Sequence, residues 1–251
     1  MALLLLFPAR AFAAAEETLR YELLWGVIRV GSAEVTTRRV EEDGRTLIRF
    51  RFTAKSNWWV EKIYPVEDCI DSFIDPETLL PVKLVKRTSE GRLQCDDQLS
   101  FDREQGVACW VDHVKSGRIE YAVAPDTRDF FSLMYVMRSF DLRPGREDRV
   151  TIAADERTHG LIIRVGREEK IPLRGGGKVR ALRLHIGSER EGLFVRKIPG
   201  AVWISSESPH VVVQMQVKVP VGSVRAVLVG GGGGAGRAAA TNLARQPGIP
   251  K

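Results

Sequence analysis

The sequence is poor in the residues that build metal and redox sites. Its 251 residues include four histidines and three cysteines, and no pair of them has the spacing of zinc ligands. The acidic residues between 67 and 75 lack the glycine and the ligand positions of a calcium loop. A nucleophile elbow of the G-x-S-x-G type is also missing. We therefore expect no metal site and no cofactor, and we assign no catalytic residues.

A long hydrophobic run is absent beyond the N-terminal residues. No later segment has the roughly 20 consecutive apolar residues that a membrane-spanning helix needs. The chain begins MALLLLFPARAFAAAEE, in which a short apolar core is followed by the A-x-A-like site Ala11-Phe12-Ala13. We interpret 1–15 as a signal-peptide-like leader, the alternative being an ordinary disordered terminus. We expect the exported, soluble product to be in the periplasm.

The three cysteines are too few to form a disulfide framework. Cys69, Cys95 and Cys109 leave at least one thiol unpaired. The expected hairpins place Cys69 and Cys95 both opposite Leu84, two strand spacings or roughly 10 Å apart. Bonded cysteines need Cα atoms within about 7 Å, and Cys109 is expected near Leu99 instead. We therefore expect no disulfide.

Charges of both signs are interleaved rather than gathered in blocks. The chain has 38 Lys and Arg against 32 Asp and Glu, a net charge of +6. No basic run is interleaved with exposed aromatic residues, as stacking on nucleic-acid bases requires. We expect no nucleic-acid partner. Attraction to an anionic membrane surface or polymer stays open, and membrane association would be peripheral at most.

Strand-like segments make up most of the chain. Residues 46–56, TLIRFRFTAKS, put Ile48 and Phe50 on one face and Arg49 and Arg51 on the other. Similar segments recur at spacings of about 8 to 12 residues, joined by Gly and Asp turns. We predict an all-β fold, with a single antiparallel and strongly curved sheet of about 12 strands, as an open barrel or sandwich.

The organisation along the chain is simple. No composition break divides 16–229, which we interpret as one β domain. The Gly/Ala-rich end at 230–251 contains Gly231-x-Gly233-x-x-Gly236, which matches a dinucleotide fingerprint. That site also needs a second parallel strand and an acidic residue about 20 positions on, and no acidic residue follows Glu207. We interpret 230–251 as a flexible tail.

One segment has helical periodicity. A short amphipathic helix is predicted near 126–140, with Asp126 as N-cap and Pro144 and Gly145 after its end. Its apolar positions form one stripe: Phe130, Leu133, Met134 and Met137. A curved sheet leaves an apolar interior, and this helix can plug it. The alternative is a mobile lid over a ligand cavity.

Two polar features remain as candidate sites. On the helix, Asp129 and Ser132 are three residues apart, as are Tyr135 and Arg138, so each pair shares a turn. The second feature is WISSESPHVVV, which begins at Trp203. In both places a structural role as cap or turn is the alternative to a reactive role.

Several short motifs follow one another along the chain. They are Leu19-x-Tyr21, Trp25-Gly26-Val27-Ile28, Gly31-x-Ala33, Ile63-Tyr64-Pro65-Val66-x-Asp68, Ser72-x-Ile74-Asp75-Pro76, Asp129-x-x-Ser132-x-x-Tyr135-x-x-Arg138, Val202-Trp203-Ile204-Ser205, Pro209-x-Val211 and Gly222-x-Val224. In this order the chain resembles the domain-of-unknown-function 3108 family, exported β-rich envelope proteins of Gram-negative bacteria. The resemblance implies an envelope protein with an all-β fold and no established activity, and it supplies no catalytic residues.

These observations together predict a non-enzymatic periplasmic protein of the cell envelope. We expect it to bind a lipid or another apolar or amphipathic ligand, or an envelope protein, in the concavity of the curved sheet. The candidate ligand-binding residues are Trp25, Tyr64, Asp129, Ser132, Tyr135, Arg138 and Trp203. Two alternatives stay open, an envelope hydrolase that uses the polar cluster on the helix and a structural scaffold without a ligand.

Overall fold

The computed structural model describes residues 16–173, 177–188, 200–208, 210–219 and 222–232. The leader expected at 1–15 lies outside the described residues, as does most of the expected tail. The part of the tail that is described, at 230–232, continues the last strand of the sheet.

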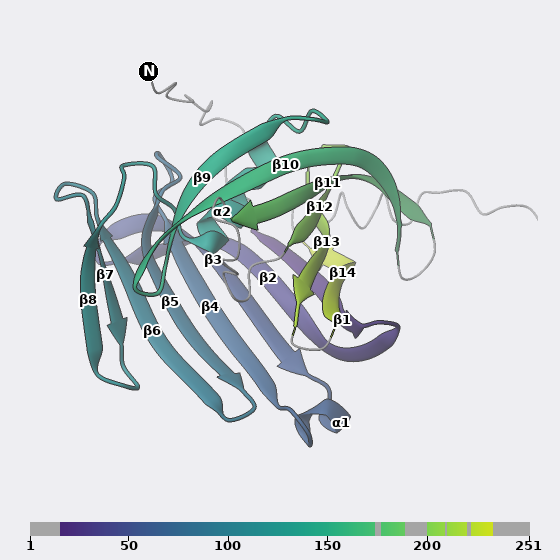
Figure 1. Cartoon of the computed structure of the whole chain (residues 1–251), viewed down its shortest axis with the longest axis horizontal. Helices are drawn as coiled ribbons and strands as arrows, with labels where there is room; N and C mark the ends of the chain where they lie inside the picture. Colours follow the sequence, from purple (N-terminus) through teal and green to yellow (C-terminus); the bar gives the residue numbers. More distant parts are fainter. Residues whose placement is uncertain (1–15, 174–176, 189–199, 209, 220–221, 233–251) are drawn as a thin grey trace, which may run out of the picture.

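Fourteen strands form one antiparallel sheet, which confirms the predicted all-β fold and adds two strands to the expected number (Figure 1). The strands are β1 (Glu17–Trp25), β2 (Ile28–Glu42), β3 (Arg45–Ser56), β4 (Val66–Ile74), β5 (Pro81–Glu90), β6 (Leu93–Asp102), β7 (Val107–Asp112), β8 (Gly117–Ala122), β9 (Glu147–Ala154), β10 (Arg157–Pro172), β11 (Lys178–Ser188), β12 (Ala201–Ser205), β13 (Val212–Lys218) and β14 (Ser223–Gly232). The described residues also form two helices, α1 (Trp58–Glu61) and α2 (Phe130–Val136), and one 3-10 turn, η1 (Met137–Ser139).

The sheet consists of two meanders joined at the chain's first and last strands. Its order is β8-β7-β6-β5-β4-β3-β2-β1-β14-β13-β12-β11-β10-β9. β1 pairs with β14 along its length, from Thr18 opposite Gly232 to Trp25 opposite Val224. Within the described residues, β8 and β9 are therefore the two edges and the sheet stays open. Figure 1 shows the two halves curving toward each other around α2.

The alternation in β3 places apolar and charged side chains as predicted. Ile48 and Phe50 are buried on the side of α2. On the other face, Arg51 donates to both carboxylate oxygens of Asp71 on β4, each over 2.7 Å. Arg49 lies 3.7 Å from the same carboxylate. The face without the helix thus pairs charges across neighbouring strands.

The helix is shorter than the predicted segment and begins later. Asp129, not Asp126, is the N-cap, and its side chain accepts from the backbone N–H groups of Phe131 and Ser132. The preceding residues are extended because Arg128 forms a parallel bridge with Ile152 of β9. After Val136 the chain tightens into η1. Tertiary pairing with β9 therefore sets the start of the helix.

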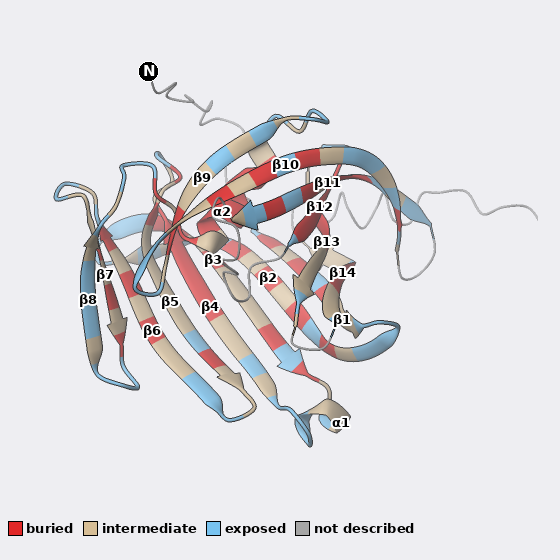
Figure 2. Cartoon of the chain, in the orientation of Figure 1, coloured by how far each residue is buried: buried red, intermediate tan, exposed pale blue. Residues whose placement is uncertain are grey.

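The helix fills the concave side of the sheet. Leu133 and Met137 are fully buried, and Met134 is 5% exposed. The ring of Tyr135 meets Phe50 of β3 edge-on, with centroids 6.2 Å apart. Buried residues gather around α2 on both halves of the sheet (Figure 2). This burial confirms the predicted plug.

The three cysteines are free, but the expected register around them is wrong. Cys69 and Cys95 pair with adjacent residues of β5, so their side chains lie on opposite faces of the sheet, and neither pairs with Leu84. The register of Cys95 differs because β5 and β6 are joined by a tight turn at Gly91, between Glu90 and Leu93. The register of Cys69 differs because a longer connection joins β4 to β5 and their pairing shifts between Phe73 and Ile74. Cys109 lies on β7 and is also free.

The plug predicts a large loss of stability when its core is truncated. Leu133→Ala should lower the free energy of unfolding by about 2–5 kcal/mol. Truncating a buried leucine loses the transfer free energy of the removed atoms and leaves a cavity. Urea denaturation followed by tryptophan fluorescence measures this. Leu93→Ala is the matched control, since Leu93 is 70% exposed and its loss should be within about 0.5 kcal/mol. Equal effects at both positions would contradict the plug.

Candidate functional site

The polar residues at the start of α2 form a buried cap. Asp129 is fully buried, and its Oδ1 accepts from the backbone N–H groups of Phe131 at 2.7 Å and Ser132 at 2.9 Å. Its Oδ2 accepts from the hydroxyl of Ser72 on β4 at 2.7 Å. Burial raises the pKa of Asp129, although the hydrogen bonds from Ser132, Ser72 and Phe131 oppose this shift. The cap thus ties the helix to the sheet.

Ser132 is not arranged as a nucleophile. Its hydroxyl donates to the backbone carbonyl of Asp129 over 2.9 Å, and the side chain is fully buried. An activated serine instead donates to a general base beside an accessible cleft. The pair that the spacing suggested does come together, and its contacts are those of a capped helix.

Arg138 forms a buried ion pair at the other end of the helical segment. Its Nη1 lies 2.5 Å from Oε2 of Glu17 on β1, and its Nη2 donates to Oε1 over 3.1 Å. Its Nε donates to the backbone carbonyl of His210 over 2.6 Å. Both charged side chains are under a tenth exposed. The partner is therefore a carboxylate 121 positions away, and no local spacing could have indicated it.

Two tyrosines lie beside this ion pair. Tyr21 is buried on β1 and donates to the carbonyl of Val212 over 2.9 Å. Burial raises the pKa of its phenol. Burial also raises the pKa of Tyr135 to about 12, against the opposing positive charge of Arg138. Tyr21 therefore contributes a hydrogen bond to the fold, and Tyr135 contributes the packing of its ring against Phe50.

Trp203, another candidate residue, packs between neighbouring strands. It is 4% exposed on β12, and its Nε1 donates to Oε2 of Glu169 on β10 over 2.8 Å. The guanidinium of Arg183 lies 5.0 Å from the centre of its ring. These contacts hold three neighbouring strands together, and the exposed edge of the indole is too small to be a binding platform.

The remaining candidates, Trp25 and Tyr64, lie on an exposed surface. Trp25 is 43% exposed and Tyr64 is 49% exposed. They belong to a set that we call the apolar rim, on the connections at one end of strands β1–β8. The apolar rim comprises Trp25, Val27, Ile28, Trp58, Ile63, Tyr64, Leu93 and Val114. These connections lie along the lower edge of the sheet in Figure 1.

The apolar rim gathers most of the exposed apolar surface. Eight of the ten large apolar side chains that are exposed among the described residues belong to it. The four most exposed are Val27 at 88%, Ile63 at 80%, Trp58 at 72% and Leu93 at 70%. The connections at the opposite end of the same strands carry none of the ten. Such segregation is unusual, because single exposed apolar residues are normally scattered.

Neighbouring connections of the rim touch one another. Asn57, which precedes α1, donates from Nδ2 to the carbonyl of Arg29 on β2 over 2.7 Å. On the other side, the backbone N–H of Gly91 donates to Pro65 over 2.7 Å. A Cβ at Gly91 would lie 2.8 Å from the ring of Tyr64. These contacts join the turns around α1 into one continuous surface.

The turn at Gly26 positions Val27, the most exposed side chain of the rim. Gly26 has φ of +61°, a left-handed conformation, in the two-residue turn between Trp25 and Ile28. This turn leaves Val27 at its tip. The indole of Trp25 approaches the next turn along the sheet, since a Cβ at Gly222 would lie 3.3 Å from its Nε1.

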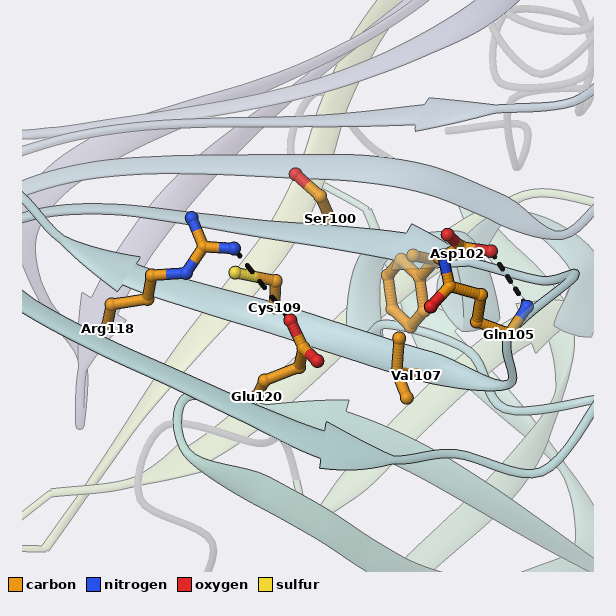
Figure 3. Close-up of a pocket in the computed structure, with 8 residues that line it drawn as sticks. Ser100, Asp102, Gln105, Val107, Cys109, Arg118 and Glu120 are labelled. Carbon is orange, nitrogen blue, oxygen red and sulfur yellow. Dashed lines mark hydrogen bonds and ion pairs between the residues drawn. The ribbon is translucent and has the colours of Figure 1, made fainter.

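Two grooves lined by both charged and apolar residues lie on the sheet. One of about 470 Å³ runs along β14 and β1–β4 and is lined by charged residues such as Arg20 and Glu34, which pair over 3.0 Å. The other, of about 330 Å³, lies on β6–β8 (Figure 3). There Arg118 and Glu120 lie 3.8 Å apart beside the Cys109 thiol. The α2 residues line neither groove.

The described residues hold no group of three or more His, Cys, Asp or Glu side chains that could bind a metal ion. Among the same residues, no helix has the length and apolar content needed to cross a membrane.

The comparison with known protein families identifies the chain's relatives. The model of DUF3108, a protein family of unknown function, matches residues 20–229. The chain belongs to this family. The match includes both the rim turn at Trp25–Ile28 and the helix residues from Asp129 to Arg138, and it confirms the resemblance seen in the sequence motifs.

A solved structure shares the architecture of this DUF3108 protein. The crystal structure of a β-barrel-like protein of the domain of unknown function DUF1849 from Brucella abortus has a TM-score of 0.56 and 12% identity to it. The likeness covers 88% of this chain and 98% of that chain. At this identity it shows the fold alone. No curated protein matches the chain.

The ion pair predicts that Arg138 is essential for stability. Arg138→Ala should lower the free energy of unfolding by about 3–5 kcal/mol, because it leaves the Glu17 carboxylate buried without a partner. The matched control is Arg143→Ala, since the Arg143 side chain is 80% exposed in its pair with Asp141, and its loss should stay under about 1 kcal/mol. Urea denaturation of both variants checks this, and similar small losses would contradict a structural ion pair.

The buried cap predicts a pH dependence of stability at acidic pH. The folded pKa of Asp129 lies above its ordinary value of 3.8, so the unfolded chain loses this proton first as pH rises. The contribution of Asp129 to stability should therefore fall as pH rises from its ordinary pKa through its folded pKa. Asn at this position keeps an oxygen for the cap and cannot titrate.

The measurement is the free energy of unfolding of the native protein minus that of Asp129→Asn, from urea denaturation at several acidic pH values. The difference should decrease as pH increases. A difference that increases with pH would mean that burial does not dominate the hydrogen bonds, and the assignment would then be wrong.

Proposed function

We propose that this protein is a non-enzymatic binding protein of the cell envelope, which binds an amphipathic partner at its apolar rim. The observation that supports this most directly is the concentration of exposed apolar side chains at one end of the sheet. A continuous apolar surface costs solubility and is rarely left exposed on a monomer without an interaction to make.

The partner is expected on the rim rather than in the interior of the sheet. Leu133 and Met137 are fully buried beneath the strands, so α2 occupies the volume that a bound ligand would need. The proposal therefore keeps the expected class of partner and moves it from the concavity to the rim. A lid would instead leave space beneath the helix.

The candidate residues divide into two roles under this proposal. Trp25 and Tyr64 contact the partner. The others, Asp129, Ser132, Tyr135, Arg138 and Trp203, hold the fold through the buried contacts described above. The hydrolase alternative gains no support from Ser132, whose hydroxyl donates to a carbonyl rather than to a base. The scaffold alternative shares the rim but has no bound partner, and is an outcome of the test.

The location in the periplasm is part of the proposal. It rests on the apolar N-terminal residues and the A-x-A-like site at Ala11-Phe12-Ala13. Membership of DUF3108 is compatible with it.

Titration with the apolar dye N-phenylnaphthylamine tests binding at the rim. The double variant Val27→Ala/Ile63→Ala should weaken dye binding by roughly threefold or more, because each buried methylene contributes about 0.8 kcal/mol. The matched control is Val229→Ala/Ile119→Ala, which removes the same atoms from exposed apolar residues off the rim and should leave binding unchanged.

Two outcomes would contradict the proposal. A dye that does not bind the native protein would favour a scaffold. A lipid that is extracted in stoichiometric amount from the purified protein, and that is retained in the rim variant, would place the ligand in the interior instead.

A further inference from the structure

The two ends of the sheet differ in charge as well as in apolar surface. Along strands β1–β8, the rim connections with their flanking strand residues (24–29, 55–67, 89–94 and 111–118) contain six Lys or Arg against four Asp or Glu. The connections at the opposite end (41–46, 73–82, 101–108 and 121–126) contain two Lys or Arg against eight Asp or Glu. This half of the sheet is therefore polarised, with its apolar end basic and its other end acidic.

The cations of the rim lie next to its apolar side chains. In each of four successive connections a large exposed apolar residue is directly adjacent in sequence to an exposed Lys or Arg. These neighbours are Ile28–Arg29, Lys62–Ile63, Arg92–Leu93 and Val114–Lys115. The ammonium of Lys62 also lies 4.9 Å from the centre of the Trp58 ring. The rim thus alternates apolar groups with positive charges along its length.

We propose that the apolar rim docks on the surface of an anionic lipid bilayer. In this arrangement the apolar side chains enter the boundary between headgroups and acyl chains, as interfacial segments do. The neighbouring Lys and Arg meet the lipid phosphates. The acidic opposite end points away, because the anionic surface repels it. This inference rests on the proposed function and names its partner.

A bilayer fits the rim better than a protein partner does. The exposed side chains sit on separate turns along one edge rather than around a pocket, so they suit a broad and deformable surface. Tryptophan and tyrosine are the aromatic residues favoured at membrane interfaces, and Trp25, Trp58 and Tyr64 are all on the rim. Long basic side chains can reach headgroups while their stems stay in apolar surroundings.

Flotation of the full purified chain with vesicles tests the proposal. The protein should float with phosphatidylglycerol vesicles, float more weakly with phosphatidylcholine vesicles, and be released from the former by salt. Val27→Glu/Ile63→Glu should lower the partition coefficient by about tenfold or more. The double variant loses the burial of two apolar side chains in the bilayer and places two negative charges at its surface. The matched control Val229→Glu/Ile119→Glu makes the same changes off the rim and should float like the native protein.

A second pair of variants separates charge from apolar insertion. Lys62→Ala should weaken binding to phosphatidylglycerol vesicles by about fivefold and leave binding to phosphatidylcholine vesicles unchanged. Lys170→Ala is the control, since Lys170 is an exposed lysine of β10 and should have no effect. Thermal unfolding of all variants ensures that only folded proteins are compared.

The outcomes distinguish this inference from the proposed function. Native protein that does not float with phosphatidylglycerol vesicles overturns the inference, and the dye titration then decides whether the rim binds another amphipathic partner. Flotation that survives the rim substitutions also overturns it, because binding through the apolar N-terminal residues would behave in this way. Loss of both dye and vesicle binding in the rim variants alone supports both proposals.

Discussion

The ion pair between Arg138 and Glu17 is the contact on which the rest of the architecture depends. The sheet is open between β8 and β9, so its two meanders are joined by strand pairing only along β1 and β14. Arg138 binds Glu17 of β1 and the carbonyl of His210 before β13, and so reaches both meanders. At the other end of the helical segment, Asp129 accepts from Ser72 of β4. The plug is therefore fixed at both ends, between the two halves of the open sheet.

This arrangement separates stability from the proposed binding. The interior is filled by α2, and its polar groups are used for capping and ion pairing, so the concave side has little left with which to recognise a partner. The rim residues contribute little to the core, since Val27 and Ile63 are largely exposed. A protein built in this way can change its binding surface without losing its fold, because the two depend on different residues.

Local patterns predicted the strands, the single apolar helix and its burial, because alternation and helical periodicity depend on neighbouring residues alone. They failed where contacts between residues distant in the sequence determine the structure. The helix starts at Asp129 and not Asp126 because Arg128 pairs with β9, and no local signal marks Glu17 as the partner of Arg138. Trp25 and Tyr64 were candidates individually, but their place on a common surface depends on strand boundaries and register that the sequence specified only approximately.

Antiparallel order explains why the rim exists as a surface at all. In a meander every second connection lies at the same end of the sheet, so the turns after β1, β3, β5 and β7 share one rim, and those after β2, β4 and β6 share the other. Residues far apart in the chain then lie on one surface only because alternate connections return to the same end of the sheet. The Brucella abortus protein shares the fold at 12% identity. A shared fold at this identity gives the arrangement of the connections and does not give the side chains on them. The proposed binding accordingly depends on the apolar and basic residues that this chain places on its turns.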